Sequence, residues 1–260
     1  MTGAPMNETI KLLLGRKSIR DFADREVPRE LRDQILQAMI RSPTAGNMML
    51  YSVIEVEDPE ARDTLVESCD RQRFIGRAPW VLLFLADYRR WMDYFGATGV
   101  EAMCREQGVE MERPLEGDLV LAMCDALIAA QTTAIAAESM GLGSTYVGDI
   151  LQHAETHRAL FALPRYTFPA ALLCLGYPSE AARSVPQRPR FDLSHIVFKD
   201  RYRSCGEADF EAMSREVGGD AIHYRSGAAN FGQHTYLKKF GTSFSREIRR
   251  AVRVWLGDWV

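Results

Sequence analysis

The sequence has few of the residues that build metal centres or redox-active thiol pairs. Its 260 residues include five cysteines and five histidines, and no CxxC motif occurs. The cysteine count is odd, and successive cysteines are widely spaced along the chain. This pattern disfavours a zinc cage or a thioredoxin-type motif and favours reduced thiols in a cytoplasmic protein. We therefore expect no bound metal.

Strong net charge and long apolar runs are also missing. The formal net charge is −3, which gives no bulk attraction to nucleic acid or to an anionic membrane, so we expect neither partner. The longest apolar run, residues 80–86, is too short to cross a bilayer, and no secretory signal is evident. Hydrophobic residues make up 47%, which is typical of a globular protein with a large core.

Two common nucleotide-binding motifs are incomplete. A P-loop, GxxxxGK[ST], would need glycine at the positions that Lys11 and Arg16 occupy. Gly141 and Gly143 begin a GxGxxG pattern, but Tyr146 stands at the third glycine position. The pattern also follows an expected helix instead of opening one. We exclude both motifs and interpret the two glycines as a helix stop.

The histidines do not form a recognisable site either. His153 and His157 are spaced i, i+4, which can bind a metal, but the glutamate of HExxH and a third ligand are missing. We interpret the pair as a solvated helix face. His195, His223 and His234 are isolated, and no serine or cysteine motif near them suggests a catalytic triad.

The apolar pattern predicts alternating helices and strands. Strands are expected at residues 51–57, 80–86, 144–147 and 169–176. Helices are expected at residues 31–40, 59–69, 88–107, 118–140 and 153–161, and the segment from 207 onward is expected to be mostly helical. Residues 178–190, rich in proline and arginine, are expected to be irregular. Residues 118–140 are apolar around nearly the whole helix and should be buried. The order favours an α+β layered domain.

Positive charge is concentrated in residues 16–20, Arg-Lys-Ser-Ile-Arg, which hold three cations and a hydroxyl. Arginine can grip phosphate oxygens with two parallel hydrogen bonds. Residues 42–47, Ser-Pro-Thr-Ala-Gly-Asn, form a small-residue turn before a strand, where backbone N–H groups can face a ligand. Arg188 and Arg190 supply a second basic pair. The alternative for residues 16–20 is a solvated helix face. Taken together, the three segments predict a phosphate-bearing cofactor.

Five segments, in this order, resemble the FMN-dependent nitroreductase family: residues 16–22, 42–47, 86–87, 141–148 and 175–178. Gln72 and the extended C-terminal tail are most similar to its branch of oxygen-insensitive NADPH nitroreductases and NADPH–flavin oxidoreductases. The similarity is good over residues 8–204 and looser in the tail.

The resemblance implies an α+β fold with a mixed, mostly antiparallel sheet flanked by helices. It also implies an intertwined homodimer with one FMN in each of two interface pockets. Residues 8–204 would form the FMN-binding domain. Residues 205–260 would form a helical extension that packs on the same domain or on the partner subunit. The helix at residues 118–140 would be the central helix of the dimer.

Family resemblance also implies roles for particular residues. The phosphate and ribityl chain of FMN would be bound by Arg16, Lys17, Ser18 and Arg20, with Arg20 also near N1 and O2 of the flavin. The partner subunit would contribute Pro43, Thr44, Ala45 and Asn47. The ribityl chain or ring would contact Gln72. The segment over the ring, with backbone N–H groups near O4 and N5, would be Tyr146, Val147, Gly148 and Asp149. A second phosphate arm would be Arg188 and Arg190, and the candidate for the 2′-phosphate of NADPH is Arg225.

The chemistry implied by the resemblance is ping-pong hydride transfer. NADPH or NADH would reduce the flavin at N5, and a nitro compound, quinone or free flavin would then take the electrons, with no protein side chain as acid or base. Two departures bear on substrate range. The family often has Asn-x-Gln-Pro-Trp after this turn, whereas Asn47 is followed here by Met48-Met49-Leu50-Tyr51, so the Gln is missing; Asp149 stands where glycine is common. The alternatives are a reductive dehalogenase-like flavoenzyme, a flavin-binding protein without turnover, and an anion-binding protein without flavin.

Overall fold

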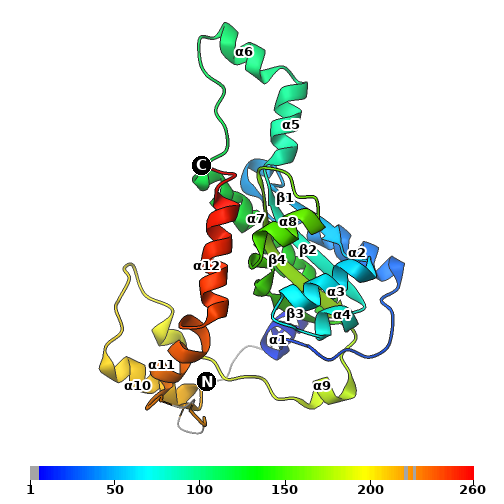
Figure 1. Ribbon diagram of the computed structural model, residues 1–260. Coiled ribbons are helices and arrows are strands. Elements are labelled where there is room, and N and C mark those ends of the chain that lie inside the picture. The colour runs from blue at the N-terminus through cyan, green and yellow to red at the C-terminus, as the bar shows by residue number, and fades with distance from the viewer. Residues whose placement is uncertain (1–5, 220–221, 225–226) are drawn as a thin grey trace. The chain divides into compact units, whose positions relative to one another are not determined.

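The computed structural model describes residues 6–219, 222–224 and 227–260 (Figure 1). Its contacts divide the chain into two compact units. The first unit comprises the chain up to Val185 together with Glu247–Val260, and the second comprises Pro186–Arg246. Each unit is described by itself below.

A four-stranded sheet with the order β1-β2-β4-β3 forms the centre of the first unit. The strands are β1 (Tyr51–Glu55), β2 (Trp80–Asp87), β3 (Gly143–Val147) and β4 (Thr167–Gly176). The two central strands, β2 and β4, are buried at every position, which explains their long apolar runs. All three ladders are antiparallel, and a single parallel bridge joins Ser18 to Ser144 beside β3. The α+β expectation is confirmed.

The first unit also contains helices and short 3₁₀ turns. They are α1 (Glu8–Gly15), α2 (Arg29–Met39), η1 (Ala45–Asn47), α3 (Pro59–Ser68), α4 (Phe74–Arg77), α5 (Arg89–Ala97), α6 (Val100–Glu106), α7 (Glu116–Ser139), η2 (Gly148–Leu151), α8 (Ala154–Leu160) and α9 (Glu180–Ser184). Of these, α5 and α6 project away from the sheet (Figure 1). Most expected helices are present, but residues 88–107 form two helices because Gly99 adopts a left-handed conformation with φ of 76°. The expectation of an irregular segment at residues 178–190 is wrong at α9, which Ser179 caps by accepting a bond from the Ala182 amide.

The long helix α7 packs on the sheet through small side chains. Its fully buried residues include Ala122, Ala126, Ala129, Ala130, Ala134 and Ala137, which allow close approach to β2 and β4. On the other side, Val120 is 62% exposed and Leu121 is 50% exposed. Within one chain, the expected burial of this helix is therefore found only on the side that faces the sheet. Its length and hydropathy would also suit a membrane span, yet 44% of the apolar stretch is buried inside the protein, as in the core helix of a globular fold.

The end of the chain returns to the core of the first unit. Helix α12 (Ser243–Leu256) carries Trp255, and Trp259 follows it; both are fully buried in the core cluster that contains Leu65 and Leu172. Arg250 makes a two-pronged ion pair with Glu155 of α8, with both N–O distances 2.8 Å. The C-terminal helix therefore completes the core instead of lying on its surface.

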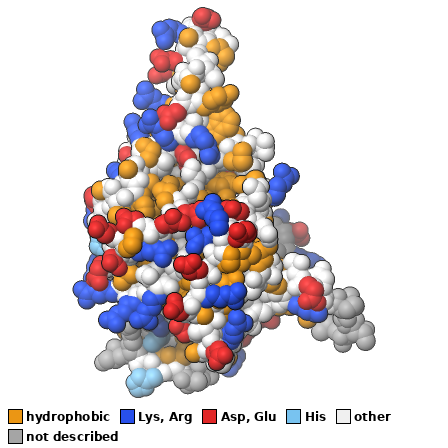
Figure 2. Space-filling view, turned by 90° about the vertical axis from the view of Figure 1, so that its right-hand side faces the viewer, with side chains coloured by type: hydrophobic (Ala, Val, Ile, Leu, Met, Phe, Trp, Pro, Cys, Tyr) orange, Lys and Arg blue, Asp and Glu red, His pale blue; other side chains and the backbone are white. Residues whose placement is uncertain are grey.

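The second unit is mostly helical in its described part. It contains η3 (Leu193–His195), α10 (Glu207–Glu216), α11 (Phe231–Thr235) and a π-helical turn (Tyr236–Phe240). His195 Nε2 lies 3.1 Å from Glu216 Oε1, and Arg203 pairs with Asp209 at 2.8 Å. Acidic and basic side chains are mixed on the face of the protein shown in Figure 2, in keeping with the small net charge.

Candidate functional site

Only two charged residues follow the first turn of α7, and each anchors a segment with predicted site residues. The first is Asp125, which is 3% exposed. Its carboxylate accepts the backbone N–H of Ala45 at 2.9 Å, the backbone N–H of Leu50 at 3.1 Å, and the hydroxyl of Thr44. A buried carboxylate is stable only when such donors replace its water. Asp125 thus fixes the turn that precedes β1.

The second isolated carboxylate, Glu138, fixes the start of residues 16–20. Arg16 Nη2 lies 3.2 Å from Glu138 Oε1, and the Ser144 hydroxyl donates to the same oxygen at 2.6 Å. The backbone N–H of Ile19 donates to the Ser144 carbonyl at 2.9 Å. These contacts hold residues 16–20 along the outer edge of β3.

Gly143, the first residue of β3, is required for this close approach. A Cβ at Gly143 would lie 2.5 Å from Cγ1 of Ile19, closer than two carbon atoms can come without a shift. Any other residue there would push residues 16–20 away from β3. Of the two glycines interpreted as a helix stop, Gly141 follows the end of α7 with φ of 83°, whereas Gly143 seats the cationic segment.

Beyond β3, the turn η2 brings two predicted site residues together. Gln72 Nε2 donates to Asp149 Oδ2 at 2.8 Å, and also to the Cys69 carbonyl at 3.0 Å. These contacts place residues 16–20 beside β3, and Gln72 beside Asp149 in the turn that directly follows β3. The segments come from three separate parts of the sequence.

His157 of α8 links η2 to the end of α3. Its Nδ1 lies 2.8 Å from the Ile150 carbonyl, and its Nε2 lies 2.8 Å from the Ser68 hydroxyl. The side chain is fully buried, so the interpretation of a solvated histidine face is wrong for His157. Burial lowers the pKa of this imidazole because the charged form would lose its water.

The cations of residues 16–20 differ in what they contact. Arg16 is paired with Glu138, and Lys17 Nζ donates to the carbonyls of Arg183, at 2.7 Å, and Val185. The Arg20 guanidinium is exposed, 5.8 Å from the centre of the Phe74 ring, and has no hydrogen bond or ion pair among the described residues. Arg20 is therefore available to bind an anion.

Other predicted site residues are not brought to this edge. Thr44 and Ala45 bind Asp125, as shown above, with Pro43 and Asn47 in the same turn. Asp125 and Glu138 are about 20 Å apart along α7, from a rise of about 1.5 Å per residue. The turn also precedes β1, at the opposite edge of the sheet from β3. Within one chain, the turn at residues 42–47 and the cationic segment at residues 16–20 therefore do not meet.

The remaining predicted residues lie outside the first unit or outside the described chain. Arg188 and Arg190 belong to the second unit, where Arg190 Nη1 donates to the Arg188 carbonyl at 3.3 Å. Arg225 falls outside the described residues. No structural role is therefore assigned to Arg225.

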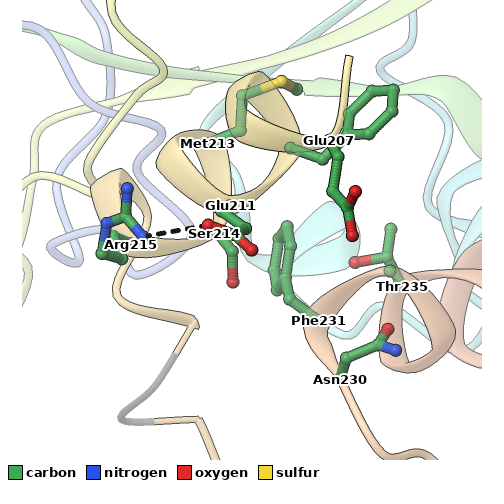
Figure 3. Close-up of a pocket in the computed structure, with 10 residues that line it drawn as sticks. Glu207, Glu211, Met213, Ser214, Arg215, Asn230, Phe231 and Thr235 are labelled. Carbon is green, nitrogen blue, oxygen red and sulfur yellow. Dashed lines mark ion pairs between the residues drawn. The ribbon is translucent and has the colours of Figure 1, made fainter. Parts of the chain in front are cut away.

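The second unit has a pocket of about 690 Å³ between α10 and α11 (Figure 3). Phe231 projects from α11 toward α10 beside Glu207 and Glu211, and Arg215 is paired with Glu211 at 3.8 Å. Two carboxylates and one already paired cation make this lining unsuited to phosphate. The pocket is therefore a poor candidate for the predicted phosphate-bearing cofactor.

Sequence reasoning missed Asp125, which fixes the turn before β1, and it missed Glu138, His157 and Ser68, which fix the segments near β3. A signal existed for the first two, because a lone carboxylate in an otherwise apolar helix needs a buried partner. No local signal pointed to the contact between His157 and Ser68, which are 89 residues apart.

A family model described as the Nitroreductase family matches residues 13–177. The chain belongs to the nitroreductase family. It is 35% identical to the FMN reductase (NAD(P)H) of Bacillus subtilis over 212 residues, which is 80% of this chain and 82% of that protein. It is 29% identical to the oxygen-insensitive NADPH nitroreductase of Salmonella typhimurium over 244 residues, which is 94% of each.

A solved structure supports the fold of this nitroreductase-family chain. The crystal structure of nitroreductase A from Vibrio parahaemolyticus aligns with a TM-score of 0.81 over 98% of each chain, at 24% identity. The family resemblance of the sequence and the nitroreductase-like α+β fold are both confirmed.

Proposed function

We propose that this protein is an FMN-dependent NAD(P)H oxidoreductase that reduces nitro compounds, quinones or flavins. The observation that carries the proposal is the seating of residues 16–20 along β3, beside Gln72 and η2, with the Arg20 guanidinium left free. The similarity to an FMN reductase and to an NADPH nitroreductase supports the same activity.

The residues at this edge fit FMN. Ser18 offers a hydroxyl, Lys17 keeps one of its three N–H donors, and Arg20 keeps its whole guanidinium. Above Gly148 no atom lies within 4 Å of where a Cβ would be, so a planar group can approach the backbone there. Arg16, Lys17, Ser18 and Arg20 would hold the phosphate and ribityl chain, and residues 146–149 would face the ring.

FMN, when bound, supplies hydride acceptance and donation at N5. The protein contributes by positioning the FMN ring and by placing charge beside it. Arg20 would set a fixed positive charge beside the ring, where it favours the negative charge that reduction adds. Gly148 leaves the backbone accessible, and the buried floor of β3 and β4 keeps water from one side. No side chain of this chain is required as an acid or base.

We also propose that the active form is a soluble, cytoplasmic homodimer. In one chain, the turn that holds Pro43, Thr44, Ala45 and Asn47 lies at the far edge of the sheet from residues 16–20. A second copy packed on the exposed apolar side of α7 would supply that turn to the site. Small-molecule electron acceptors would then enter a pocket built by both subunits.

The remaining assignments concern the second unit and the tail. Arg188 and Arg190 are proposed as the second phosphate arm, and Arg225 as the contact for the 2′-phosphate of NADPH. Residues 8–204 are proposed as the FMN-binding domain and residues 205–260 as a helical extension. The burial of Trp255 and Trp259 in the first unit supports packing of the extension's end on the same domain.

The test of the phosphate assignment is a double variant, Arg16→Ala with Arg188→Ala. Removing both arms should strip the flavin, because each arginine supplies charge-assisted bonds to phosphate. The measurement is FMN content per chain, from the absorbance of the purified protein. A matched control, Arg105→Ala with Arg215→Ala, removes one exposed arginine from each unit. A double variant that retains full FMN content would show that the assignment is wrong.

A further inference from the structure

Two protein acceptors fix the amide of Gln72 in one orientation. Its Nε2 donates to the Cys69 carbonyl at 3.0 Å and to Asp149 Oδ2 at 2.8 Å. A backbone carbonyl and a carboxylate only accept hydrogen bonds. The flipped amide would therefore point its own oxygen at two acceptors and lose both bonds. The two acceptors therefore determine which side of the Gln72 amide carries the nitrogen.

Both N–H groups of the amide are consumed by these two bonds. The remaining polar atom, Oε1, has no hydrogen-bond partner among the described residues, and the side chain is half-buried. Gln72 can therefore offer a ligand only an acceptor. An ordinary glutamine could offer either a donor or an acceptor.

The carboxylate that enforces this choice is itself held in place. Gln152 Nε2 donates to Asp149 Oδ1 at 3.3 Å. One residue further on, the Ile150 carbonyl can only accept, so His157 Nδ1 must carry the proton. His157 Nε2 lies 2.8 Å from the Ser68 hydroxyl, and this contact ties η2 to the end of α3. Asp149 thus lies on a turn fixed from the core.

We propose that Asp149 is a positioning residue that makes Gln72 a dedicated hydrogen-bond acceptor in the cofactor pocket. This inference rests on the proposed function. FMN carries two kinds of donor that such an acceptor can bind, the ring N3–H and the ribityl hydroxyls. The acceptor atoms of the ring, N1, O2, O4 and N5, cannot pair with Gln72. The orientation is set before binding, so less freedom is lost when the cofactor binds.

The test is a double-mutant cycle on FMN affinity. The full-length chain is stripped of flavin and titrated with FMN, and the quenching of flavin fluorescence gives Kd. Gln72→Met removes the acceptor at nearly the same volume and should weaken binding roughly fivefold. Asp149→Asn keeps the shape but can present its own N–H, so the Gln72 amide is no longer fixed, and binding should weaken by a similar factor.

The decisive result is the double variant. Because both changes remove the same interaction, the double variant should bind FMN no more weakly than Gln72→Met alone. Gln37→Met, at an exposed glutamine of α2, is the control and should leave Kd unchanged. Independent, additive losses from the two changes, or an unchanged Kd in either single variant, would overturn the proposal.

A cofactor analogue identifies the donor. If Gln72 accepts from the ring, 3-methyl-FMN should bind the protein and Gln72→Met equally well. If it accepts from a ribityl hydroxyl, the fivefold difference should persist with 3-methyl-FMN. A stripped parent chain that binds no FMN would instead contradict the proposed function, so the two failures are distinguishable.

Discussion

The imidazole of His157 lies in the core between a carbonyl and a hydroxyl, where neither neighbour carries a charge. Its pKa is lowered by burial, so in the folded protein it stays neutral at pH values where the unfolded chain already takes up a proton. The unfolded state then binds more protons than the folded state. The neutral, buried His157 therefore contributes its full stability above the ordinary histidine pKa of 6.5, and that contribution is lost as the pH falls below this value.

This predicts a specific acid sensitivity. The free energy of unfolding should fall between about pH 7.5 and about pH 5, and His157→Gln should flatten that fall because glutamine does not titrate. At about pH 7.5 the variant should be less stable by about 2 kcal/mol, from the altered buried hydrogen bonds. Urea unfolding at both pH values measures the free energy of unfolding of the parent protein and of the variant. His153→Gln, at the exposed neighbour, is the control. An equally steep fall in His157→Gln would show that another group is responsible.

At the scale of elements, α7 sets the geometry of the site. Its two isolated carboxylates, Asp125 and Glu138, hold the turn before β1 and the cationic segment beside β3. Its small residues allow it to lie close to the sheet, and the rise of the helix sets the separation between the two anchors. Movement of α7 would therefore displace both segments.

Asp125→Ala tests the first anchor. The substitution leaves the Ala45 and Leu50 amides and the Thr44 hydroxyl without their acceptor, so the free energy of unfolding should fall by about 3 kcal/mol. Thermal and urea unfolding measure the loss, and Glu116→Ala at the exposed start of α7 is the control. A loss equal to that of the control would mean that Asp125 does not hold the turn.

Much of the fold was predictable from sequence because it depends on local patterns. Strands β2 and β4 contain long apolar runs, and Asp58-Pro59 is a complete helix start, so both features were evident. Helix α9 was missed because the prolines on both sides of it dominate the composition of residues 178–190, although Ser179 was a usable cap. The composition of an apolar helix does not reveal whether its second side meets its own chain or another copy, so the exposed side of α7 did not follow from the apolar pattern alone.

The site was predictable only in part. Residues 16–20 and residues 146–149 were found by composition and resemblance, and the structure brings them to one edge. The bond between Gln72 and Asp149, and the burial of His157, depend on residues 77 and 89 positions apart in the sequence. Contacts of this kind arise from tertiary packing and leave no local pattern.

At the scale of the whole molecule, the proposed FMN site needs two copies of the chain. Val120→Arg with Ile128→Arg places two charges on the exposed apolar side of α7, where they would be buried by a partner. We expect a monomer in analytical ultracentrifugation, together with loss of bound FMN. Leu193→Arg changes an exposed leucine of the second unit and is the control. A dimer with full FMN content would contradict the proposed assembly.

The central claim is that the protein binds FMN and exchanges electrons with a nicotinamide. Anaerobic stopped-flow absorbance of the FMN-loaded protein, mixed separately with NADPH and NADH, tests it directly. We expect rapid loss of the flavin absorbance with at least one of the two nicotinamides, and its return when a nitroaromatic compound or quinone is added. A flavin absorbance that neither nicotinamide bleaches, or a purified protein that cannot take up FMN, would contradict the account.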